Sequence, residues 1–306
     1  MHLTLGILRT SQAVFYALAF FWLDGFAVPT PAQVTQTVGA FLQNIKESMK
    51  TYRNFIWKNA LEYLSERVDI DILRQYMSHS DDSKPESFSE IYLRLLKSLT
   101  NKRNMPNSIG DVERLKSIFW GFDHKKTLEA YSDWQSLLQE IRVKINPSSV
   151  IDENNSHNYW VIFCKGALSS ATWLNRFSTL EEFSSYVDDF DQSPNTRPAL
   201  PFLMGEEIFG YGFALACDFL KESGFSNFSK PDIHLIDIFS GLGISTKAPI
   251  DIFRTVSLMA KEVGETPYAI DKVFWLIGSG KLYDHNESFK TDKFKFVEQV
   301  KAKWVL

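Results

Sequence analysis

Apolar residues recur every three or four positions along much of this chain, which is the spacing of one buried face of an α-helix. The longest such pattern covers residues 31–69. Pro29 and Pro31 mark its beginning, because proline suits the first turn of a helix. Its apolar positions are Val34, Val38, Phe41, Leu42, Ile45, Met49, Tyr52, Phe55 and Ile56. The pattern predicts one long amphipathic helix.

Shorter periodic segments follow, separated by polar breaks. Helices are predicted at residues 88–100, 111–122, 127–145 and 178–190, with breaks at 78–87, 101–111 and 146–158. The helix at 178–190 opens with a Ser-x-x-Glu capping box, Ser178 to Glu181. Alternating patterns typical of strands are scarce. The predicted fold class is therefore all-α.

Composition and charge limit the classes of function. The chain has 306 residues, of which 44% are hydrophobic and 14% aromatic, so it is long and apolar enough to build two folded domains. Its net charge of −4 provides no chain-wide attraction for nucleic acid or for an anionic membrane. A phosphate must therefore be bound by a local group of donors.

The two cysteines and one apolar run near the N-terminus indicate the cellular compartment of the protein. Cys164 and Cys217 lie in apolar stretches, so we expect reduced, buried thiols, no metal site and a cytoplasmic location. The apolar run at residues 13–23 is too short to span a bilayer, and only one basic residue, Arg9, precedes it. We interpret this run as a buried helix and expect no membrane partner.

A Gly-Tyr-Gly sequence, Gly210 to Gly212, precedes a helical pattern that starts at Phe213. Glycine permits positive φ and close approach of the backbone to another molecule. The N–H groups at such a helix start are suited to bind a phosphate. A plain helix–helix turn is the structural alternative.

The sequence PDIHLIDIFSGLGIS follows at residues 231–245. Together with the glycine turn it resembles the helix-hairpin-helix (HhH-GPD) DNA glycosylase superfamily, in particular members similar to endonuclease III. That family has a Leu-Pro-Gly-Val-Gly hairpin, then Asp-x-His, then Leu-Gly. The matching residues here are Gly210, Gly212, Asp232, His234, Leu242 and Gly243. The resemblance covers residues 189–282, is weak over 159–189 and is absent over the first 150 residues.

The resemblance implies a two-lobed helical fold, with a glycosylase core at residues 151–306 and an additional helical region at 1–150. It implies that Asp232 is catalytic, because one carboxylate can stabilise the positive charge that develops on the deoxyribose and can orient water. A helix N-cap is the structural alternative for Asp232. The implied DNA-binding residues are Gly210, Tyr211, Gly212, Phe213, Lys230 and His234, with a monovalent cation on the carbonyls of the turn and no other cofactor.

Departures from the family pattern narrow the expected chemistry. The hairpin proline is Phe209, and no four-cysteine iron–sulfur loop is present in the sequence. The family's lyase lysine is replaced by Ala214, which lies 18 residues before Asp232 as in the family (232 − 214). Without that amine no Schiff base forms at this position. We therefore expect a monofunctional glycosylase that uses water, with Lys230 as the alternative source of an amine.

The target base must leave the helical stack to reach Asp232. Trp160, Phe163 and Trp173 are candidates for its pocket, although aromatic residues at helical spacing are also typical of a core. The expected partner is double-stranded DNA bound by a monomer. The resemblance leaves open the excised base and the role, in repair or in defence against phage DNA with modified cytosine such as the glucosylated hydroxymethyl form. A helix-hairpin-helix DNA-binding protein without activity, and an α-helical interaction protein, are the alternative functions.

Overall fold

The computed structural model describes residues 31–305 except 79–83, 103–104, 148 and 283–286. The predicted all-α class is confirmed, since the described residues are mostly helical. Strands β1 (Lys281–Leu282) and β2 (Glu287–Ser288) form one short antiparallel pair. The apolar run at residues 13–23 lies outside the described part of the chain.

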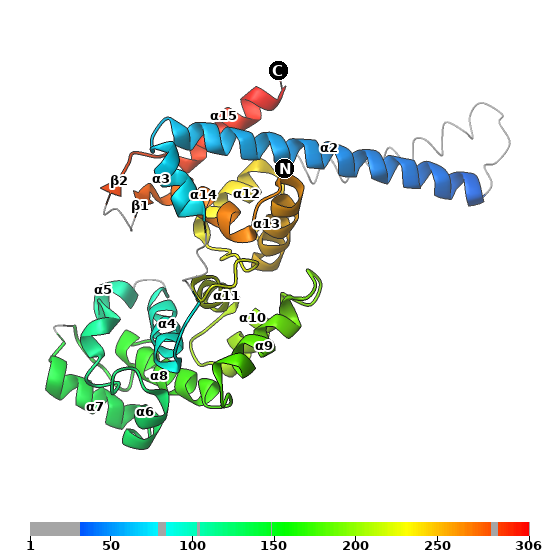
Figure 1. The fold of residues 1–306 in the computed structure, drawn as a ribbon. Coiled ribbons are helices and arrows are strands. Elements are labelled where there is room, and N and C mark those ends of the chain that lie inside the picture. Colours follow the sequence, from blue (N-terminus) through cyan, green and yellow to red (C-terminus); the bar gives the residue numbers. More distant parts are fainter. Residues whose placement is uncertain (1–30, 79–83, 103–104, 148, 283–286, 306) are drawn as a thin grey trace.

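The helices form two bundles, each around its own apolar core (Figure 1). The first, called here the central bundle, consists of α4 (Phe88–Thr100), α5 (Met105–Ile109), η2 (Val112–Leu115), α6 (His124–Ala130), α7 (Trp134–Ile145), α8 (Tyr159–Leu174), α9 (Leu180–Asp191), α10 (Ala199–Glu207) and α11 (Phe213–Glu222). Its core includes Tyr92, Phe119, Phe163 and Phe219, all fully buried. α4 and α8 pack together at its centre.

The second, called here the terminal bundle, joins the two ends of the described chain. It consists of α2 (Pro31–Ser65), α3 (Ile70–Met77), α12 (Ile233–Leu242), α13 (Pro249–Val263), α14 (Pro267–Ser279) and α15 (Lys293–Val305). Among the described residues, the second half of α2 packs on the other helices of this bundle, and its first half extends away from them (Figure 1). Each bundle draws core residues from both sides of residue 150.

Local hydrogen bonding explains where some predicted boundaries are wrong. Residues 127–145 are split into α6 and α7, because the Asp133 side chain accepts the N–H of Ser136 and begins a new helix there. Residues 111–122 form only the short η2, followed by three residues with positive φ, Trp120, Gly121 and Phe122. The N-cap of α9 is Thr179 rather than Ser178, with its hydroxyl 3.1 Å from the N of Glu182.

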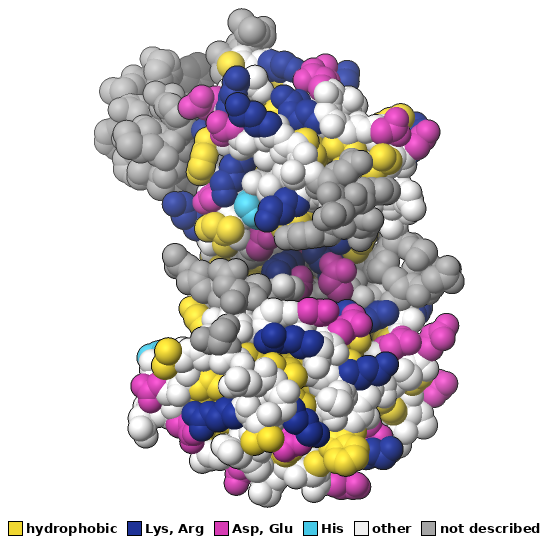
Figure 2. Space-filling model, turned by 90° about the vertical axis from the view of Figure 1, so that its left-hand side faces the viewer, with side chains coloured by type: hydrophobic (Ala, Val, Ile, Leu, Met, Phe, Trp, Pro, Cys, Tyr) yellow, Lys and Arg dark blue, Asp and Glu magenta, His cyan; other side chains and the backbone are white. Residues whose placement is uncertain are grey.

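Charge of both signs is spread over the face shown in Figure 2, as expected from the small net charge. Within the described residues, no helix is long and apolar enough to cross a bilayer. Cys164 and Cys217 are free and buried, as the sequence predicted.

Candidate functional site

The Gly-Tyr-Gly sequence forms a tight turn between α10 and α11. Gly210 has a φ of +83°, which only glycine adopts without strain, and the Tyr211 N–H donates across the turn to the Ile208 carbonyl at 3.1 Å. The Tyr211 side chain is buried, and its hydroxyl lies 2.6 Å from the carbonyl oxygen of Leu95 on α4. Tyr211 therefore fixes the turn to the central bundle. Its N–H is not available for a phosphate, contrary to the sequence expectation.

Three consecutive amides follow the turn, at the exposed Gly212 and at Phe213 and Ala214, which are half-buried. Within the described residues, no acceptor hydrogen-bonds to the N–H groups of Gly212, Phe213 and Ala214. Gly212 has an extended backbone, with φ of −152°, and a Cβ added there would meet open space. The backbone conformation at position 212 therefore does not require glycine. Its lack of a side chain leaves the start of α11 uncovered, and such an N-terminus attracts an anion.

Lys102, which the sequence did not single out, brings a positive charge to the same turn. Its Nζ lies 3.4 Å from the carbonyl oxygen of Gly210. Leu95 of α4 contacts Tyr211, and Lys102, which lies two residues beyond the end of α4, contacts Gly210. The distance in sequence, 108 residues, explains why periodicity and local motifs could not reveal it.

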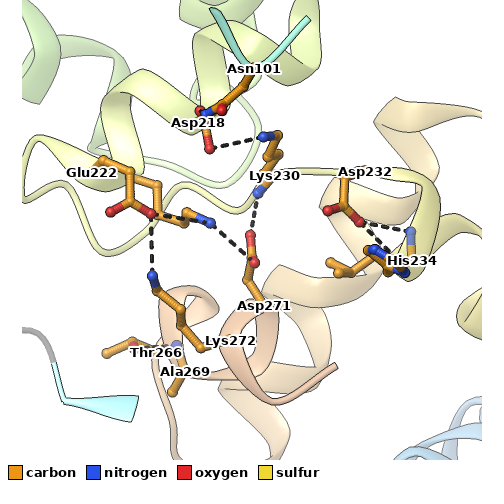
Figure 3. Close-up of polar contacts among 12 residues, drawn as sticks. Asn101, Asp218, Glu222, Lys230, Asp232, His234, Thr266, Ala269, Asp271 and Lys272 are labelled. Atoms are coloured by element: carbon orange, nitrogen blue, oxygen red, sulfur yellow. Dashed lines mark hydrogen bonds and ion pairs between the residues drawn. The ribbon is translucent and has the colours of Figure 1, made fainter. Parts of the chain in front are cut away.

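Asp232 is the N-cap of α12. One carboxylate oxygen, Oδ1, accepts the N–H of His234 at 2.8 Å and that of Leu235 at 3.1 Å (Figure 3). No described residue donates a hydrogen bond to the second oxygen, Oδ2. The side chain is half-buried. Asp232 therefore caps the helix with one oxygen and retains a second oxygen for another molecule.

His234 follows Asp232 and is half-buried against α14 of the terminal bundle. A Cβ added to Gly278 of α14 would lie 2.4 Å from the His234 Cβ, so the two helices approach closely at this glycine. Burial lowers the pKa of His234, although the nearby Asp232 carboxylate opposes the shift. The buried Nδ1 has no hydrogen-bond partner among the described residues. His234 thus contributes mainly to helix packing.

Lys230 points away from Asp232 (Figure 3). Its Nζ forms an ion pair with Asp218 of α11, at 3.1 Å from Oδ1. The other oxygen of Asp218 accepts a hydrogen bond of 2.8 Å from Asn101. Burial acts to raise the pKa of Asp218, but the ammonium groups of Lys230 and Lys221 outweigh it and hold that pKa below its ordinary value. The Lys230 amine is therefore committed to an ion pair in this structure.

A second buried ion pair connects the two bundles. Lys221 near the end of α11 lies 3.2 Å from Oδ1 of Asp271 on α14, with side chains 6% and 1% exposed. The backbone N–H of Lys230 donates to Oδ2 of Asp271. Burial favours a neutral Lys221, yet the carboxylates around it, Asp271 foremost, raise its pKa well above the ordinary value. Sequence reasoning missed this pair, because its members are 50 residues apart.

The aromatic residues proposed for a base pocket are core residues. Trp160 and Phe163 are 1% and 0% exposed and pack against each other edge to face. Trp173 is also buried, and its Nε1 donates to Glu207 at 2.9 Å. Their place in the core of the central bundle corrects the assignment to a pocket. The Phe213 ring likewise packs against Phe202 of α10 and Phe253 of α13.

Comparisons with protein-family models, with curated proteins and with solved structures find no match to this chain. Function must then be inferred from the geometry of the described residues. Two features stand out, the uncovered amides at the start of α11 and the half-free carboxylate at the start of α12. The segment from residue 223 to residue 232 joins them.

Proposed function

We propose that this protein is a monofunctional DNA glycosylase of the helix-hairpin-helix type, which removes a base by hydrolysis of its N-glycosidic bond. The single observation that carries the proposal is that the chain contains two helix starts, those of α11 and α12, with complementary polar groups. Within the part of the chain that the structure describes, the first has three amides without an acceptor, and the second has a carboxylate with one oxygen that accepts no hydrogen bond. The turn α10–α11 and the sequence of Asp232 and His234 match the family in the order and spacing described above.

The first helix start would bind a DNA phosphate. Amides of Gly212, Phe213 and Ala214 can donate to phosphate oxygens, and the dipole of α11 favours a negative charge there. Lys102 adds a full positive charge at the Gly210 carbonyl, in the place where the family resemblance implies a monovalent cation. Contacts of this kind fix the position of the duplex without reading its sequence.

The second helix start would carry the chemistry. Cleavage of an N-glycosidic bond develops positive charge on the deoxyribose, and an ionised carboxylate beside C1′ stabilises that charge. The free Oδ2 of Asp232 can face the sugar or orient the attacking water, while Oδ1 remains bound to the α12 amides. The helix cap and the catalytic role are thus compatible in one residue.

Strand cleavage is not part of the proposed activity. A lyase needs a neutral amine that attacks C1′. Ala214 occupies the family's lysine position, and the Lys230 amine is bound to Asp218. The product would be an abasic site in an intact strand. Both repair of damaged bases and defence against modified phage DNA are roles for such an enzyme.

The test is mass spectrometry of nucleobases released from duplex DNA that carries alkylated, mismatched or glucosylated hydroxymethyl-cytosine bases. Release of one free base by the parent protein, and its loss in Asp232→Asn, supports the proposal. Binding of plain duplex DNA without release from any substrate would indicate an inactive helix-hairpin-helix DNA-binding protein. Absence of binding in an electrophoretic shift would instead favour an α-helical interaction protein.

A further inference from the structure

We propose that the Lys221–Asp271 ion pair positions Asp232 relative to the start of α11, and that Asp271 is a positioning residue for the carboxylate. The catalytic part of this inference rests on the proposed glycosylase function. The structural part does not rest on that function, because it concerns only how the Lys221–Asp271 pair fixes the turn before α12.

A chain of polar contacts leads from α11 to Asp232, and Figure 3 shows its part between Asp271 and Lys230. The Lys221 ammonium of α11 contacts Oδ1 of Asp271 on α14 at 3.2 Å. Oδ2 of the same carboxylate accepts the backbone N–H of Lys230. The Lys230 carbonyl in turn accepts the N–H of Asp232 at 2.8 Å. One buried carboxylate therefore connects the helix of the proposed phosphate site to the residue with the free oxygen.

The Lys221–Asp271 ion pair is expected to contribute little to the stability of the fold. A fully buried ion pair loses hydration on both charges, and apolar residues of similar size often replace such a pair without loss of stability. Directional contacts at both carboxylate oxygens instead define one geometry. Since α11 belongs to the central bundle and α14 to the terminal bundle, that geometry sets where Asp232 lies relative to the amides of α11.

The chain offers a matched control. Arg53 of α2 and Glu262 of α13 form another nearly buried ion pair, with contacts of 2.6 and 2.5 Å and side chains 8% and 10% exposed. This pair also joins two helices, but both belong to the terminal bundle and neither carries Asp232. Lys221→Met with Asp271→Ala removes the first pair, and Arg53→Met with Glu262→Ala removes the second. Glu222, which also lies 3.5 Å from Lys221, keeps its contact with Lys272, and Asp218 keeps its contact with Lys230.

The first measurement is hydrogen exchange of the His234 and Leu235 amides, which donate to Asp232. Exchange is compared at conditions where the variants have equal global stability. We expect exchange at these two amides to rise about tenfold or more in Lys221→Met/Asp271→Ala, and to stay at the parent rate in Arg53→Met/Glu262→Ala. Lys221→Met/Asp271→Asn restores an acceptor for the Lys230 N–H, so its exchange should return toward the parent rate. An equal rise in both double variants, or no rise in either, would overturn the positioning role.

The second measurement is base release by the same variants under single-turnover and steady-state conditions. Mispositioning of Asp232 should lower kcat by about tenfold or more with little change in KM, since the phosphate amides are untouched. A parental kcat in Lys221→Met/Asp271→Ala would overturn the catalytic part. If the parent protein releases no base while the exchange result is as expected, the proposed function has failed and the positioning of Asp232 stands.

Discussion

The Lys102 ammonium lies 3.4 Å from the carbonyl oxygen of Gly210, at the turn that precedes three amides without a hydrogen-bond acceptor among the described residues. The ammonium group polarises the Gly210 carbonyl. It also adds positive electrostatic potential next to the start of α11. Lys102 thus supplies from the chain a charge that a bound ion would otherwise supply. Two consequences can be measured.

Duplex binding should depend little on the identity of the monovalent cation in the parent protein, and should weaken in Lys102→Met. We expect the variant to lose about tenfold in affinity at low salt and to become sensitive to exchange of sodium for potassium or lithium. Lys125→Met provides the control, because it removes the same charge from an exposed position in α6. Electrophoretic shifts in the three chloride salts measure both effects. Equal affinity in Lys102→Met and Lys125→Met would contradict a role for Lys102 at the turn.

Gly212→Ser should separate stability from DNA binding. The N-cap conformation of Gly212 suits serine, whose hydroxyl would accept an amide of the first turn of α11 and occupy the open space there. We expect the free energy of unfolding to rise by about 0.3 kcal/mol, while affinity for duplex DNA of any sequence falls.

Ala248→Ser is the matched control, because Ala248 is the N-cap of α13 and has no capping side chain. This change should raise the free energy of unfolding by about 1 kcal/mol and leave DNA binding at the parent level. Chemical denaturation and electrophoretic shifts measure the two quantities. Parental binding in Gly212→Ser would remove the start of α11 from the interface.

Asp232→Asn should abolish base release while leaving the fold intact. Asparagine caps a helix about as well as aspartate, so Oδ1 can still accept the amides of His234 and Leu235. The negative charge is lost, and we expect the single-turnover rate to fall by about a hundredfold to a thousandfold. Asp133→Asn makes the same change at the N-cap of α7 and should retain the parent rate. Retained turnover in Asp232→Asn would refute the catalytic assignment.

Sequence periodicity predicted most helices, since each buries one apolar face, and it placed Asp232 and the glycine turn correctly at helix starts. What it could not predict depends on pairs that are distant in sequence. Tyr211 and Leu95 are 116 residues apart, yet their hydrogen bond determines which amide of the turn is already used. Trp160 illustrates a different limit, because helical spacing is the same for an aromatic residue in a core and in a pocket.

The pH dependence of stability should report on His234. Burial lowers its pKa in the folded state below the ordinary value of 6.5. As the pH falls through 6.5, the unfolded chain takes up a proton that the folded chain does not, so the free energy of unfolding decreases. His234→Gln should show a smaller decrease over this interval in chemical denaturation. His157→Gln, at an exposed position before α8, should follow the parent. Identical pH profiles for parent and His234→Gln would contradict this prediction.

The Lys230–Asp218 ion pair leads to a prediction on strand cleavage. With the Lys230 Nζ held 3.1 Å from the Asp218 carboxylate, and Ala214 at the position where the resemblance would place the lyase lysine, we expect no amine to attack C1′. Borohydride reduction during turnover should therefore trap no covalent adduct, and the strand should break only after treatment with alkali. Asp218→Asn removes the charge that holds the Lys230 ammonium in the ion pair, and therefore tests whether this ion pair prevents attack by Lys230. A trapped adduct that appears in the parent and disappears in Lys230→Ala would show that the lysine is the nucleophile. Base release with neither nick nor adduct, in the parent and in Lys230→Ala alike, would mean that Asp232 and water are sufficient.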